Sequence, residues 1–203
     1  ATITVDNGDL IVRATDNVTV NSSSEAAAIA AGFSLFSASI SLSGGGAQAD
    51  AIVRGSTEAE IGNSTITLTE GTLSVDADQD VTVNSTSGSL SIAGSLNSLA
   101  AGGSVANIEI SPSITASLED STSYATDISV VSTLTPSGLA KANGLSAGPG
   151  AAVWVSETEV ILNSTLESQV GGSGTITAQS LNVESRTDRI IDENNVEVRK
   201  TGE

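Results

Sequence analysis

An internal repeat limits what this chain can fold into more than any other feature of its sequence. Segments 3–24 and 66–87 align without a gap at an offset of 63 residues, and 12 of the 22 positions are identical. The similarity continues more weakly after a shift of six residues, which brings Gly45 and Gly46 onto Gly102 and Gly103. A third and shorter copy follows, with insertions and deletions between its strand-like pieces. A period of this length predicts supersecondary units stacked on one another.

Within each unit the apolar residues alternate with polar ones at a period of two. Ile3 and Val5 alternate with threonine, and Val18 and Val20 do the same further along. Short alternating runs of this kind, separated by turn residues, are typical of half-buried β-strands. We therefore predict a repetitive β region over residues 1–187, with units at about 3–65, 66–127 and 128–187. The charged segment 188–203 is set apart as a capping or inter-subunit segment.

The composition excludes several classes of function. The 203 residues contain no His, Cys or Met, which removes the commonest general base, thiol nucleophiles and disulfides. The net charge of −17 repels phosphate and anionic lipid, so we expect neither nucleic-acid binding nor membrane insertion. Serine and threonine number 55, yet 38% of the residues are hydrophobic, which is too apolar for a disordered chain.

The predicted location is outside the cell. The chain begins at Ala1, and nothing near its start has the basic and apolar regions of a signal peptide, so any signal is expected to have been removed. The most apolar window, 26–36, is too short to span a bilayer. An acidic surface rich in serine and threonine, without cysteine, is typical of bacterial secreted or surface proteins.

Two all-β architectures remain open, a parallel β-solenoid and a β-sandwich. Four aromatic residues are few for a sandwich core, whereas a narrow solenoid fills with small and aliphatic side chains. The repeat length also divides into about three coils of roughly 20 residues, the size of a β-helix turn, and around ten such coils would form a rod of about 50 Å. The solenoid is the favoured prediction.

The order of blocks within a repeat resembles that of a known group of proteins. An alternating block (TLSVDADQDVTVNSTS) leads into a stretch rich in Gly, Ala and Ser (SLSIAGSLNSLAAGGSVAN), and a polar block ends in an Asp-Ser-Thr turn (IEISPSITASLEDSTS). This succession resembles the repeats of large bacterial filamentous adhesins and related β-helical surface exoproteins. The resemblance implies a right-handed parallel β-helix that serves as a stalk, fibre or adhesive surface. The third copy departs from the pattern at Pro136, Gly138, Pro149 and Trp154.

Asp76, Asp78 and Asp80 are the candidate metal ligands. Their spacing matches the start of an EF-hand loop, but the glycine and the glutamate that such a loop needs are replaced by Val81 and Ser87. Weak calcium binding and a solvated acidic edge are the two interpretations. No other cofactor is predicted.

Five N-x-[ST] sequons are candidate glycosylation sites. Stacked asparagine side chains bonding along the solenoid would produce the same recurrence without sugar. The repeat alignment pairs the second sequon with the fourth and the third with the fifth. The five asparagines are Asn17, Asn21, Asn63, Asn84 and Asn163.

Catalysis is not predicted. Carboxylate pairs such as Glu58/Glu60 and Glu157/Glu159 fall two residues apart on one side of a strand, which is typical of a solvated face. We predict a non-enzymatic structural or adhesive segment of a bacterial surface fibre. The alternative is a carbohydrate-binding sandwich module that contacts surface glycans through Trp154.

The predicted partner is a second copy of the chain or a neighbouring repeat of a longer one. The first strand, 2–5, resembles the internal strand 65–68, so the first coil is expected to leave an open edge. The tail 188–203 contains alternating Val196 and Val198, and we expect it to pair with such an edge. A head-to-tail homopolymer of thin fibres follows from this prediction.

Overall fold

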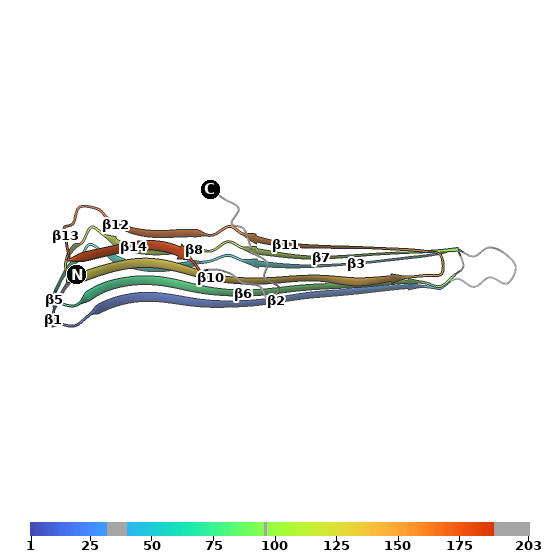
Figure 1. Ribbon diagram of the computed structural model, residues 1–203, viewed down its shortest axis with the longest axis horizontal. Helices are drawn as coiled ribbons and strands as arrows, with labels where there is room; N and C mark the ends of the chain where they lie inside the picture. Colours follow the sequence, from blue (N-terminus) through green and yellow to red (C-terminus); the bar gives the residue numbers. More distant parts are fainter. Residues whose placement is uncertain (32–39, 96, 189–203) are drawn as a thin grey trace.

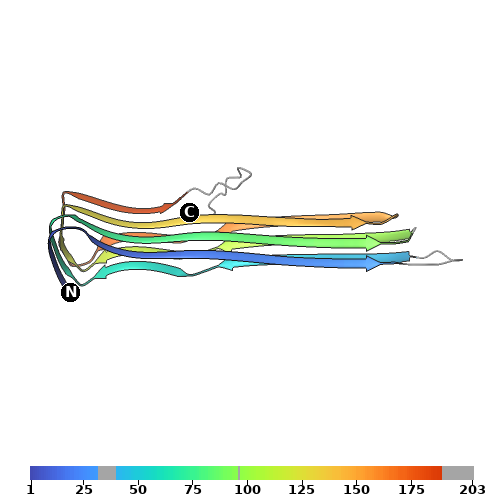
Figure 2. The ribbon, with the colours of Figure 1, turned by 90° about the horizontal axis from the view of Figure 1, so that it is seen from below.

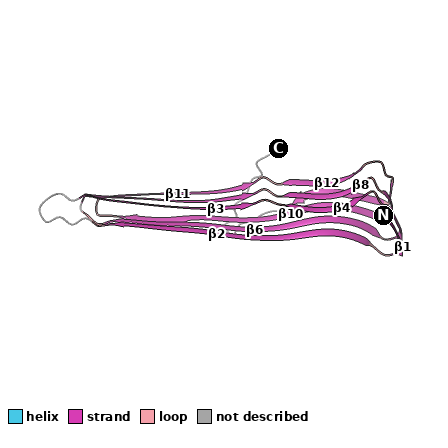
Figure 3. Cartoon of the chain, turned by 180° about the vertical axis from the view of Figure 1, so that it is seen from behind, coloured by secondary structure: helices cyan, strands magenta, loops and turns pink. Residues whose placement is uncertain are grey.

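The chain folds into a flattened β-solenoid. The computed structural model describes residues 1–31, 40–95 and 97–188. Figure 3 shows that these residues form strands and connecting loops, without a helix. In chain order the strands are β1 (Thr2–Asn7), β2 (Leu10–Ala30), β3 (Ile40–Val53), β4 (Ser56–Gly62), β5 (Thr65–Glu70), β6 (Thr72–Ala93), β7 (Asn97–Ile110), β8 (Ser113–Glu119), β9 (Thr122–Tyr124), β10 (Asp127–Ala147), β11 (Ala151–Leu162), β12 (Thr165–Gly171), β13 (Ile176–Thr177) and β14 (Ser180–Thr187).

Four parallel sheets wrap around one interior. The long sheet, in the order β14-β10-β6-β2, forms one layer, and the sheets β11-β7-β3 and β12-β8-β4 form the opposite layer. The short sheet β1-β5-β9-β13 closes one end, which lies at the left of Figure 1 and which we call the broad end. The opposite end, where the long strands turn back, is the narrow end.

One repeat makes one coil. Leu10 lies beside Leu73 in the sheet, so the sequence offset of 63 residues is the register between neighbouring strands. The first coil comprises β1–β4, the second β5–β8 and the third β9–β12, while β13 and β14 begin a fourth. The expectation of three 20-residue coils within each repeat, and of a ten-coil rod, is therefore wrong.

The long axis of the molecule follows the strands instead of the stack of coils. Strand β2 has 21 residues, which corresponds to roughly 70 Å at the usual rise per residue. Figure 2 shows these long strands running side by side along the molecule. Successive coils add only about 4.8 Å each in the perpendicular direction.

The parallel solenoid predicted from the sequence is confirmed. Every pairing between described strands is parallel, from the short pair β9–β13 to the long pair β2–β6. The β-sandwich alternative is wrong, because that fold needs antiparallel sheets.

The broad end holds a tightly packed aliphatic core. Its centre is the second coil, where Ile66, Leu68 and Leu73 are at most 1% exposed. Residues from the opposite layer, such as Ile108 and Ile114, complete the same cluster. Burial of these branched side chains is the main source of stability, at about 25 cal/mol per Å² of apolar surface.

The interior of the narrow end consists mainly of serine, alanine and glycine. The two layers approach each other towards this end (Figure 1), because the side chains between them become smaller. Serine hydroxyls donate hydrogen bonds across the gap, from Ser85 Oγ to Ala49 O and from Ser87 Oγ to Ala47 O, each 2.8 Å long. These bonds satisfy polar groups that would otherwise be buried without partners.

The predicted role of the tail lies outside the described residues. Residues 189–203, including Val196 and Val198, are not described, so the pairing of the tail with a coil edge stays a prediction.

Candidate functional site

The three candidate metal ligands lie on the outer face of the long sheet. Asp76, Asp78 and Asp80 alternate along β6 with inward residues, so their carboxylates share one face. Arg13 of the neighbouring strand β2 donates a 3.0 Å hydrogen bond to Asp76 Oδ2 and lies 3.9 Å from Asp78. This contact raises the pKa of Arg13.

The cationic partner of Asp76 and Asp78 is therefore a side chain of the first coil. Ser74 Oγ donates a second hydrogen bond to Asp76, at 2.9 Å. Within residues 1–31, 40–95 and 97–188, no group of three or more carboxylates is arranged to hold a metal ion. The acidic-edge interpretation fits this geometry, with Arg13 providing the compensating charge.

Two of the sequon asparagines form a ladder between coils. Asn84 Nδ2 donates a 2.9 Å hydrogen bond to Asn21 Oδ1 on the adjacent strand. This is the stacked arrangement that accounts for the recurrence without sugar. Asn17 is exposed on the same outer face, beside Asp80.

The remaining two sequon asparagines belong to different corners of the coil, so their alignment with each other is wrong. Asn63 has a φ of 50°, and its equivalent Asp120 has a φ of 47° in the next coil, with Gly172 at 90° in the third. Asn163 lies instead at the turn between β11 and β12, equivalent to Ser111. The sequence alignment matched Asn63 with Asn163 because both corners consist of small polar residues.

Asp120 stabilises its corner through hydrogen bonds from the coil above. The backbone N–H of Ser173 donates to Asp120 Oδ1 at 2.8 Å, and the Ser173 hydroxyl donates to the same oxygen at 3.1 Å. Both bonds favour the carboxylate and hold the pKa of Asp120 below its ordinary value. Their stabilising effect is present above the unfolded-state pKa and is lost as the pH falls through the folded-state pKa.

We expect Ser173→Ala to raise the pKa of Asp120 part of the way to its ordinary value, because the backbone bond remains. The measurement is an NMR titration of the Asp120 carboxyl carbon. The control is Ser121→Ala, since the Ser121 hydroxyl donates to the Glu119 carbonyl and should leave the Asp120 pKa unchanged. Equal shifts in both variants would contradict this assignment.

Trp154, the candidate ligand contact, faces the interior at the narrow end. Its neighbours in the ladder are the inward-facing Gly102 and Gly45. The indole lies against Gly144 of the opposite layer, where an added Cβ would collide with Trp154 Nε1. Trp154 is 37% exposed because no described strand covers the outer edge of β11. Its position is that of a packing residue.

A double-mutant cycle tests this packing. Gly144→Ala should destabilise the fold by about 2 kcal/mol through overpacking. In the Trp154→Ala background, the same substitution should cost at least about 1 kcal/mol less. Gly88→Ala is the control, because its added Cβ comes no closer than 3.7 Å to any atom outside its chain neighbours. Urea unfolding gives the four free energies. Equal costs of Gly144→Ala in both backgrounds would show that the indole does not pack there.

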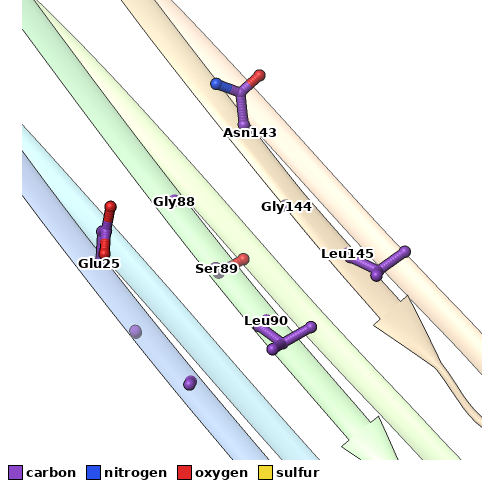
Figure 4. Close-up of a pocket in the computed structure, with 9 residues that line it drawn as sticks. Glu25, Gly88, Ser89, Leu90, Asn143, Gly144 and Leu145 are labelled. Atoms are coloured by element: carbon purple, nitrogen blue, oxygen red, sulfur yellow. The ribbon is translucent and has the colours of Figure 1, made fainter.

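A hollow of about 680 Å³ crosses three coils near the narrow end. Figure 4 shows Gly88 lying between Glu25 and Asn143, with Leu90 and Leu145 on the adjacent row. The absence of a side chain at Gly88 creates the depression. Its apolar row is well exposed to solvent, with Leu145 at 59%.

Exposed apolar side chains also occur on the opposite outer face of the narrow end. Leu42 is 69% exposed, Val153 is 55% and Val155 is 63%. The sequence analysis missed this surface. For the apolar row beside the hollow, on the other face, the available signal was the run from Ser85 to Ile92 in β6, in which serine takes over the inward positions of the preceding valines.

The carboxylate pairs lie on outer faces of the solenoid. Glu58 and Glu60 are exposed on β4, and Glu157 and Glu159 are exposed on β11. Among the described residues no helix is long and apolar enough to cross a membrane. No protein-family model, curated protein or solved structure matches the chain.

Proposed function

We propose that this chain is a non-enzymatic structural and adhesive segment of a bacterial extracellular surface fibre, similar to the repeats of filamentous adhesins. The observation that carries the proposal is the constant register between coils. Equivalent residues stack from β2 through β6 to β10, so further coils can be added without a change in geometry. A stack of this kind serves as a stalk, because each unit contacts only its neighbours.

The adhesive part of the proposal rests on the narrow end. Apolar side chains are exposed there on both outer faces, at Leu145 on one side and at Val153 and Val155 on the other. Contiguous exposed apolar surface marks contact sites in soluble proteins. The acidic charge elsewhere opposes side-by-side clumping of fibres.

Electron microscopy of the isolated chain tests the structural part. Thin filaments that grow with protein concentration are expected, and a strictly monomeric chain at all concentrations would contradict self-assembly. For the adhesive part, the test uses a surface to which the unmodified chain binds. Leu145→Asp should abolish this binding, while Thr86→Asp on the same sheet should not. Binding of the unmodified chain to a glycan array would favour the carbohydrate-binding alternative.

A further inference from the structure

The last described strand, β14, carries inward-facing apolar residues that no other described strand covers on its outer side. Leu181 continues the inward column Leu10, Leu73 and Ile128, and it is 51% exposed. Val183 continues the next column in the same way and is 43% exposed. The second-coil members of both columns, Leu73 and Val75, are 0% exposed. The described part of the fourth coil therefore presents two inward-facing apolar side chains that are exposed.

The opposite side of the stack presents the matching surface. Leu10 and Val12 head the same two columns in β2 and are only partly buried. Among the described residues, no strand pairs with the outer edge of β1 or β2. Its unpaired backbone groups can continue a parallel ladder.

Opposite charges lie at the two ends of one outward column. Arg13 occupies the β2 end, followed by Asp76 and Val131, and Glu184 occupies the β14 end. Both side chains are substantially exposed, at 56% for Arg13 and 46% for Glu184. Continuation of the stack would bring the guanidinium of one copy beside the carboxylate of the next. The same contact between Arg13 and Asp76 already exists within the chain.

We propose that a second copy of this chain docks the edge of its β2 onto β14, in parallel and in the register of the internal coils. Leu10 of one copy then covers Leu181 of the other, Val12 covers Val183, and Arg13 pairs with Glu184. The inference rests on the proposed function, and it places the joint between subunits on β14 in place of the tail 188–203. The contact is head-to-tail, so it produces an open stack.

Engineered cysteines test the register directly, because the natural sequence has none. Ile11 and Asn182 would lie side by side across the joint, one residue along from the leucine pair. Within one chain they are three strand spacings apart, about 14 Å, which is too far for a disulfide. The variant with both Ile11→Cys and Asn182→Cys should therefore form a ladder of covalent oligomers on oxidation.

The matched control shifts the register by six residues. The variant with Asn17→Cys and Asn182→Cys places the two thiols roughly 20 Å apart along the joint, so it should remain monomeric in a non-reducing gel. An equal ladder in both variants, or no ladder in the first, would overturn the proposed joint. If the first variant shows filaments by electron microscopy but no ladder, the proposed position of the joint is wrong, whereas the proposal that the chain forms a fibre is supported.

Two further variants test whether the joint between subunits lies on β14 or elsewhere. Leu181→Asp buries an unpaired carboxylate in the docked state and should weaken association at least about tenfold, while Asn182→Asp on the opposite face should not. Both monomers should keep their β circular dichroism. The variant with Ile11→Cys and Asn182→Cys should still form the ladder of covalent oligomers when its chain is truncated after Asp188. Loss of the ladder on this truncation would assign the joint to residues 189–203 and overturn its placement on β14.

Discussion

Replacing Gly71 with alanine is expected to destabilise the fold by about 3 kcal/mol or more. Gly71 has a φ of 143°, which side chains rarely adopt, and an added Cβ would collide with the carbonyl oxygen of Gly8 in the coil below. The backbone at this corner cannot move away freely, because Gly8 N donates to Glu70 O and Thr126 N donates to Gly71 O. Urea unfolding of the variant measures the loss.

Gly88→Ala is the matched control in the same coil. Its added Cβ meets only the Glu25 side chain, at 3.7 Å, and it needs no unusual backbone conformation. The stability of this variant should be unchanged or slightly higher, since alanine restricts the unfolded chain. A similar loss in both variants would show that the corner geometry is not the cause.

The second large effect is expected from truncating the apolar column at its centre. Leu73→Ala should cost about 3 to 4 kcal/mol, because Leu73 is fully buried between coils. The same substitution at Leu10 should cost less, since only the second coil covers that side chain, on one side. At Leu181, which is 51% exposed, it should cost less than about 1 kcal/mol in the monomer.

This series compares one residue type in one column, so side-chain chemistry is constant and only the extent to which the neighbouring strands cover the side chain changes. The free energies are measured by urea unfolding at a concentration where the chain is monomeric. Equal costs at the three positions would contradict the stacked arrangement of the coils.

The register of the fold could be predicted because parallel coils place equivalent residues side by side. The alignment that matched Leu10 with Leu73, and Gly45 with Gly102, is the pairing found in the sheets. The length of a coil could not be predicted in the same way. Polar residues inside β2, such as Asp16, resemble a turn in the sequence.

In the structure Asp16 points inward and accepts a 3.0 Å hydrogen bond from Gln79 Nε2 in the second coil. The strand therefore continues through a polar position, because the neighbouring coil supplies the partner. Such a contact depends on residues 63 positions apart and has no local signature.

The narrow end shows a second limit of sequence patterns. Alternation alone assigns Leu90 and Ile92 to the core and Ser89 and Ser91 to solvent. Strand β6 runs unbroken from Thr72 to Ala93, so its inward positions are set by Leu73 and Val75 at the broad end. Serine consequently falls inside, where its hydroxyl bonds to the opposite layer and its small size lets the layers approach.

The length of the coils determines how the molecule would respond to a pulling force. A coil holds between 52 and 63 residues, yet it occupies only about 4.8 Å along the stack. If tension peels away one terminal coil, the released segment extends to roughly 200 Å. The coils beneath it stay folded, because each depends only on its immediate neighbours. A tether of this design lengthens in large steps and limits the peak load on whatever it holds.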